Sequence, residues 1–136
     1  MITSKILQVC WLHEVVDQLV TSFTAKAISN KNLFVNEIPG HLQLVRDPQV
    51  IASVLGGLLS TIVSYAKDSC IQLSAKMYGN VILVRVKSPC GFNSNGIEKQ
   101  LQTLLPLAER MRGAIGFTSQ RNNITTICLG FSNLPL

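Results

Sequence analysis

Residues 47–67, which read DPQVIASVLGGLLSTIVSYAK, decide the fold. Apolar residues recur in this stretch at the three- and four-residue spacing of a helix, so they form one stripe along it. Asp47 is of a type that caps helix N-termini, and Pro48 suits the first helical position, where a missing N–H costs nothing. The stripe consists of Ile51, Val54, Leu55, Leu58, Leu59 and Ile62. We therefore predict a helix that begins at Pro48 and buries this stripe.

The opposite side of the same helix carries small or hydroxyl-bearing residues and no charge. Its members are Gly57, Thr61, Ser64 and Tyr65. The whole run 48–66 is uncharged and long enough to span a bilayer. Its interior serine, threonine and glycine content and its lack of aromatic or basic belts argue against a membrane span. We predict a buried central helix and no membrane insertion.

The composition describes one well-packed domain. The 136 residues match the usual size of a single domain, so we assign residues 1–136 to one unit. Hydrophobic residues make up 47% of the chain and charged residues only 14%, which excludes a disordered chain and predicts that a partner covers some apolar surface. The net charge of +5 comes from scattered lysines and arginines without interleaved aromatic residues. We therefore expect no nucleic-acid binding.

The cysteine spacing and the first twelve residues bear on metal binding and on location in the cell. The four cysteines show no CxxC spacing and no matching histidine pair, so we expect free thiols rather than a zinc site. The first twelve residues contain no small-residue cleavage site. We therefore expect no signal peptide and a cytoplasmic location.

The rest of the chain alternates between helical and strand patterns. Further helices are predicted at residues 12–30 and 97–111, with Pro106 kinking or dividing the second. Strands are predicted at residues 6–9, 33–38, 41–46, 71–77, 81–87, 114–118 and 123–131. The turn at Pro39-Gly40 predicts that the strands on either side of it pair as an antiparallel hairpin. This order predicts an α+β fold, a two-layer sandwich of a mixed, mostly antiparallel sheet covered on one face by three helices.

The pattern resembles the ATP-binding catalytic domain of sensor histidine kinases, within the wider group of gyrase-type ATPases. In that family's central helix, Asp and apolar residues precede the motif Asn-Leu-Leu-x-Asn-Ala-x-Lys-Tyr. Val54-Leu55, Leu58-Leu59 and Tyr65 match it here. Residues 107–116 resemble the helix-to-strand turn near the family's end. The resemblance covers nearly the whole chain and implies the histidine-kinase-type ATPase fold.

The nucleotide-binding residues that this family uses are not matched. By the resemblance, Thr61 stands where an Asn holds the magnesium ion, and Gly57 stands where an earlier Asn or a hydrolase Glu lies. Ser64 replaces the Lys of the same motif. Ser88 replaces the Asp that reads the adenine amino group, and Cys90 falls on the glycine two residues later.

These departures predict that nucleotide binding is lost. Losing a carboxylate that accepts a buried amine hydrogen bond costs about 1.5–3 kcal/mol, and a serine recovers only part of it. The family's glycine-rich phosphate lid is replaced by residues 89–101, in which Lys99 offers one charge but no backbone cradle. We therefore expect no ATP or magnesium cofactor, no catalytic residue and no metal ligand. Six vestigial pocket positions remain, namely Gly57, Thr61, Ser64, Tyr65, Ser88 and Cys90, and we expect Tyr65, Phe92 or Leu101 to fill the space between the central helix and the loop after Ser88.

Three functional hypotheses follow. The first is a degenerate histidine-kinase-type ATPase domain, a non-catalytic signalling module that binds a signalling protein or forms a homodimer. The alternative is a divergent kinase or ATPase domain of a two-component system, which binds ATP and magnesium through Thr61, Ser64 and Ser88. A second alternative is a phosphotransfer adaptor that uses His13, although a lone histidine without a dimerising partner helix is typical of a surface residue. Cys90 has no base within a few residues, which indicates an inert thiol.

Overall fold

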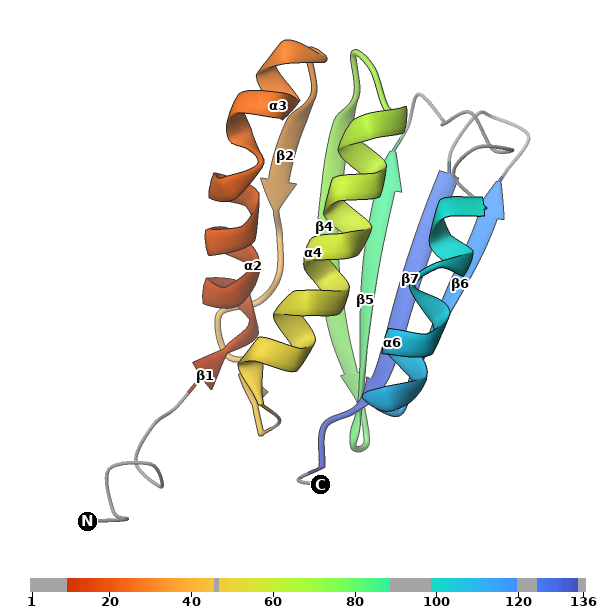
Figure 1. The fold of residues 1–136 in the computed structure, drawn as a ribbon. Coiled ribbons are helices and arrows are strands. Elements are labelled where there is room, and N and C mark those ends of the chain that lie inside the picture. The colour runs from red at the N-terminus through yellow and green to blue at the C-terminus, as the bar shows by residue number, and fades with distance from the viewer. Residues whose placement is uncertain (1–9, 46, 89–98, 120–124, 135–136) are drawn as a thin grey trace.

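The molecule consists of two layers, a β-sheet and a layer of helices. The structure is a computed structural model and describes residues 10–45, 47–88, 99–119 and 125–134. Helices α2 (Leu12–Ser22), α4 (Pro48–Tyr65) and α6 (Leu105–Arg110) lie side by side on one face of a five-stranded sheet (Figure 1). The predicted α+β sandwich with helices on one face is confirmed.

The sheet has the strand order β2-β4-β5-β7-β6. Its strands are β2 (Leu33–Asn36), β4 (Cys70–Tyr78), β5 (Val81–Ser88), β6 (Gly113–Ser119) and β7 (Thr125–Ser132). Every pairing is antiparallel except that of β2 with β4, which is parallel. The predicted strands at residues 71–77 and 81–87 pair as the hairpin β4–β5, and those at 114–118 and 123–131 pair as β6–β7. The predicted strand at residues 6–9 lies outside the described residues. Buried and exposed residues alternate along β5 and place its even-numbered residues on the helix-covered face.

One predicted pairing is wrong. Residues 33–38 and 41–46 do not form a hairpin with each other. Instead, β3 (Gln43–Leu44) pairs antiparallel with β1 (Cys10–Trp11) in a separate two-stranded sheet. The parallel register of β2 sets Phe34 beside Ile71, which is fully buried, and Glu37 N–H donates to the Leu73 carbonyl at 2.8 Å. Burial against the core therefore outweighs the local turn at Pro39-Gly40.

The predicted helix at residues 12–30 is divided at Phe23 into α2 and α3 (Thr24–Ser29). Around the break, the hydroxyls of Thr21, Ser22 and Thr24 each donate to the carbonyl four residues earlier, at 2.9–3.0 Å. These bonds compete with the helical N–H groups for the same carbonyls, which bends or interrupts a helix. The second expected division is confirmed: residues 99–102 are helical, and α6 follows with Pro106 in its first turn.

Helix α4 is the central core helix. The Asp47 carboxylate accepts a hydrogen bond from Gln49 N–H at 2.9 Å, and Pro48 is the first helical residue, as predicted. Its buried residues are Ile51, Val54, Leu55, Leu58, Leu59, Ile62 and Val63. By length and composition alone the helix could cross a membrane. Within this fold it lies between α2 and α6 with its apolar stripe in the core (Figure 1).

Candidate functional site

Three of the six vestigial positions meet at the C-terminal half of α4. Thr61, Ser64 and Tyr65 line an open depression of about 480 Å³, together with Ser60 and Gln100. Gln100 belongs to the helical segment 99–102 that follows β5. Because β5 runs toward the same end of the molecule, Ser88 lies at this end as well (Figure 1). Cys90 and Phe92 lie outside the described residues.

Two hydroxyl groups of the depression, those of Thr61 and Ser64, already donate their protons to the helix. Thr61 Oγ1 donates to the Gly57 carbonyl at 2.9 Å, and Ser64 Oγ donates to the Ser60 carbonyl at 2.9 Å. Ser64 Oγ in turn accepts a bond from Lys26 Nζ at 3.2 Å. Since a hydroxyl has a single proton to donate, neither side chain has a donor left for a phosphate oxygen in this arrangement.

The side chain of Leu104 packs against Gly57. A Cβ atom added at Gly57 would lie 2.5 Å from Leu104 Cδ2, which is closer than real Cβ contacts come. Leu104 lies just before α6 and is 9% exposed, and Leu101 on the same segment is buried in the core. An Asn or Glu at position 57 would therefore require Leu104 to move. Leu104 falls within the helix predicted at residues 97–111, but no pattern in the sequence links it to Gly57.

The cost of the overlap between a side chain at position 57 and Leu104 can be measured by comparing alanine substitutions at Gly57 and at Gly56. A Cβ at Gly56 would meet Leu19 Cδ2 at an ordinary 3.6 Å. We expect Gly56→Ala to raise the free energy of unfolding by about 1 kcal/mol through helix propensity. Gly57→Ala gains the same amount but should lose part of it, because the flexible end of Leu104 must shift to make room for the new methyl group.

The comparison uses urea denaturation of both variants, alone and combined with Leu104→Ala. In the Leu104→Ala background, Gly57→Ala should become as favourable as Gly56→Ala, because the overlapping methyl group is gone. Equal stabilisation by the two alanines with Leu104 present would contradict the contact.

Ser88 is a buried polar residue whose hydroxyl group has no hydrogen-bond partner among the described residues. It is fully buried at the end of β5, opposite the equally buried Thr125. Strand alternation turns Ser88 to the helix-covered face with Val84 and Val86. Among the described residues its Oγ has no hydrogen-bond partner. An unpaired buried hydroxyl costs about 1–3 kcal/mol of stability. Ser88 therefore destabilises the fold unless a residue outside the described part of the chain pairs with it.

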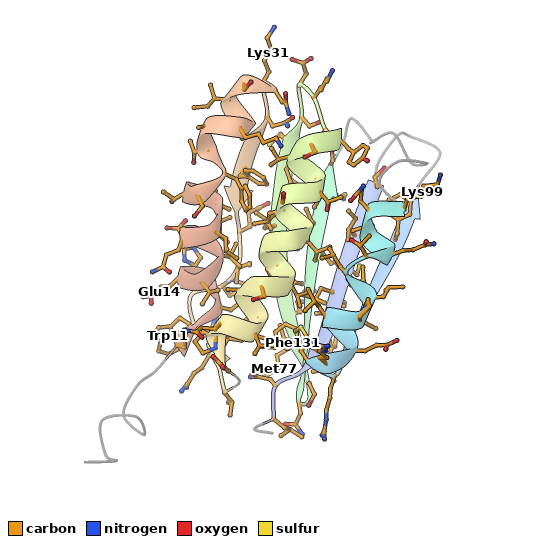
Figure 2. All side chains as sticks on the ribbon, in the orientation of Figure 1. Trp11, Glu14, Lys31, Met77, Lys99 and Phe131 are labelled. Carbon is orange, nitrogen blue, oxygen red and sulfur yellow. The ribbon has the colours of Figure 1, made fainter. Side chains whose placement is uncertain are left out.

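The other chemical candidates lie away from this depression. Lys99 points away from α4 (Figure 2). His13 is half-buried in the first turn of α2, at the opposite end of the fold from Thr61 (Figure 1). Burial, with a smaller contribution from Glu14, raises the pKa of the Cys10 thiol, which makes it a weaker nucleophile at neutral pH. No group of three or more metal-ligating side chains occurs in the described part of the chain.

Comparison with known proteins defines the fold. No protein-family model matches this chain, and no curated protein sequence does. Among solved structures, the Acinetobacter baumannii histidine kinase AdeS superposes with a TM-score of 0.76 at 12% identity, over 93% of this chain and 66% of that one. The catalytic domain of histidine kinase ThkA gives a TM-score of 0.73 at 14% identity, over 95% of this chain and 98% of that one. A histidine kinase from Burkholderia phymatum gives 0.76 at 13% identity, over 93% and 72%. The chain therefore has the fold of histidine-kinase catalytic domains.

Proposed function

We propose that this chain is a non-catalytic histidine-kinase-type domain, which acts in two-component signalling by binding a protein rather than by phosphoryl transfer. The observation that carries the proposal is Leu104, whose Cδ2 would lie 2.5 Å from a Cβ at position 57, so that a side chain there requires Leu104 to move. Two further observations support it. The protons of Thr61 and Ser64 are committed to helix carbonyls, and the buried Ser88 hydroxyl recovers only part of the bond that an adenine-binding carboxylate provides.

The partner that fits this proposal is a signalling protein of the same system. A solved structure of ThkA, which superposes with a TM-score of 0.73 at 17% identity, shows that kinase in complex with the response regulator TrrA. We infer that a response regulator or a kinase is the partner class here, and that the domain works in the cytoplasm. The match covers 42% of that chain, so the rest of that kinase has no counterpart in the superposition.

A specific observation favours one alternative, a divergent domain that still binds ATP and magnesium. The depression of about 480 Å³ is lined by Thr61 and Ser64, which this alternative uses and which keep acceptor lone pairs there. Under this alternative a nucleotide would have to displace the hydroxyl protons from the helix carbonyls.

Titration with ATP and magnesium decides between the two. We expect calorimetry to show no micromolar binding, because three lost contacts at about 1.5 kcal/mol each weaken a site roughly a thousandfold. Thermal unfolding with 1 mM nucleotide should not shift, whereas a ligand at 100 times its Kd would add about 2.7 kcal/mol. A magnesium-dependent Kd in the micromolar range, with amide shifts confined to Thr61, Ser64 and Gln100, would overturn the proposal and support the alternative.

A further inference from the structure

Strand β6 is an edge of the sheet. Among the described residues it pairs with β7 on one side only, in a continuous register, and it forms the outer edge of the sheet in Figure 1. Its seven residues read GAIGFTS and contain no charge and no proline. The opposite edge, β2, has only four residues and is followed by Glu37 and Pro39. Short strands, charges and proline are the usual means of preventing edge pairing, so β2 is protected and β6 is not.

Two hydrogen bonds show which backbone groups of β6 face the free edge. Ser132 N–H donates to the Arg112 carbonyl at 3.5 Å, and Asn133 N–H donates to the Asn80 carbonyl at 2.6 Å. Hydrogen-bonded and non-bonded pairs alternate along an antiparallel ladder. In the observed registers, both bonds assign the even-numbered residues of β7 to bonds with β6 and the odd-numbered ones to bonds with β5. The N–H and C=O groups at odd positions 113–119 therefore point away from β7.

A groove that is lined by four apolar residues and one glutamine runs beside this edge. It has a volume of about 230 Å³ and is lined by Leu101, Gln102, Leu105, Ile115 and Phe117. Leu105 is 40% exposed, and the two β6 residues are half-buried. A strand that added to β6 would bury apolar side chains against this groove while its main chain paired with the edge.

We propose that a second copy of the chain occupies this edge, so that β6 pairs antiparallel with the partner's β6 about a two-fold axis at Gly116. Among registers that pair outward-facing positions, this one overlaps the entire strand. It sets Ile115 opposite the partner's Phe117, an aromatic and β-branched pair of the kind that stabilises sheets. The two-fold symmetry places both helix layers on the same face of the joined sheet, beside the two grooves.

Self-complementarity is what selects a second copy rather than an unrelated strand. No charged residue of either β6 strand meets another across the axis, because the strand contains none. The pairing is isologous and consumes both unprotected edges, leaving the protected β2 edges outside, so it closes at two copies instead of growing into a fibre. This interface goes beyond the proposed function, because neither Gly57 nor the depression at Thr61 takes part in it.

Lysine substitution at the axis tests the interface. A Cβ at Gly116 would meet nothing within 4 Å, so Gly116→Lys is compatible with the fold of one copy. In the dimer it places two lysines directly opposite each other. Sedimentation velocity should show wild-type protein at twice 14.9 kDa, and Gly116→Lys should weaken the dimer roughly 100-fold.

The matched control is Ala114→Lys, which adds the same charge to the same exposed face. Its lysine lies opposite the partner's position 118 rather than another lysine, so the dimer Kd should change by less than about threefold. An equimolar mixture of Gly116→Lys and Gly116→Glu should recover dimer as a mixed pair. Amide exchange at Ile115 and Phe117 should be slow in wild type and fast in Gly116→Lys.

Three results would overturn the proposal. They are a wild-type monomer at high concentration, a dimer that Gly116→Lys leaves intact, and equal loss of dimer in the Gly116→Lys and Ala114→Lys variants. Circular dichroism of each variant separates loss of the interface from loss of the fold. An ATP titration that failed or succeeded would leave these outcomes unchanged, so the two proposals are tested separately.

Discussion

Replacing Asn32 with alanine is expected to lower the free energy of unfolding by about 2–5 kcal/mol, because it leaves two buried backbone groups unpaired. Asn32 is 6% exposed. Its Nδ2 donates to the Ala66 carbonyl at 2.8 Å, and its Oδ1 accepts from Ser69 N–H at 3.1 Å. One side chain thus joins the end of α4 to the start of β4.

Asn36→Ala is the matched control for this prediction. Asn36 also makes two bonds, since its Nδ2 donates to the His13 carbonyl and its Oδ1 accepts from Ile38 N–H. It is only half-buried, so water can replace both partners, and we expect a loss of about 1 kcal/mol or less. Urea denaturation of both variants measures the difference. Similar losses for Asn32 and Asn36 would show that the bridge between α4 and β4 is not a main source of stability.

The bridge also fixes the candidate site. The backbone between the two bridged residues turns at Asp68, which has a φ of +53°, and Asp68 N–H donates to the Asn30 carbonyl at 3.1 Å. The last turn of α4, which carries Ser64 and Tyr65, precedes this turn directly. We therefore expect Asn32→Ala to shift the amide resonances of Ser64 and Tyr65 more than those of residues in the first turn of α4.

Local signals in the sequence were enough to predict most of the elements. Asp47 and Pro48 mark the start of α4, and the alternation along residues 71–77 and 81–87 marks the hairpin β4–β5, because both patterns involve neighbours in sequence. The pairing of β2 was predicted wrongly for the same reason. Its true partner, β4, is a non-local neighbour, and nothing in residues 33–38 indicates that distant register.

The candidate site was harder to predict than the fold. The resemblance drew attention to Gly57, Thr61 and Ser64 on one helix, and the structure does bring the last two to one depression. The contact of Gly57 with Leu104 joins residues far apart in the chain, so no local pattern could indicate it. The missing partner of Ser88 was equally hidden, because hydrogen-bond satisfaction depends on the packed neighbours and not on residue type.

Restoring the family's carboxylate at position 88 should damage the fold rather than restore a site. Ser88→Asp places a charge in a fully buried position where the described residues give the native hydroxyl no hydrogen-bond partner. An uncompensated buried charge costs about 3–5 kcal/mol. Ser88→Asn has nearly the same shape without the charge, so the difference between the two variants isolates the electrostatic cost. Ser88→Ala removes the unpaired hydroxyl and should raise the free energy of unfolding by about 1–3 kcal/mol.

The pH dependence of Ser88→Asp gives the sharper test. Burial raises the pKa of the introduced carboxyl group above its unfolded value of about 3.9, because desolvation disfavours the charged form. Below that unfolded pKa the group is protonated in both states, so the electrostatic cost is absent. As the pH rises the unfolded state ionises first, and the variant loses stability relative to wild type until the folded pKa is passed. Urea denaturation of Ser88→Asp, Ser88→Asn and wild type at pH 4 and pH 7.5 should therefore show a deficit that grows with pH for the aspartate alone. If Ser88→Asp were as stable as Ser88→Asn at pH 7.5, hydrogen-bond donors would have to reach position 88, and the loss of nucleotide binding would no longer be supported by the burial of Ser88.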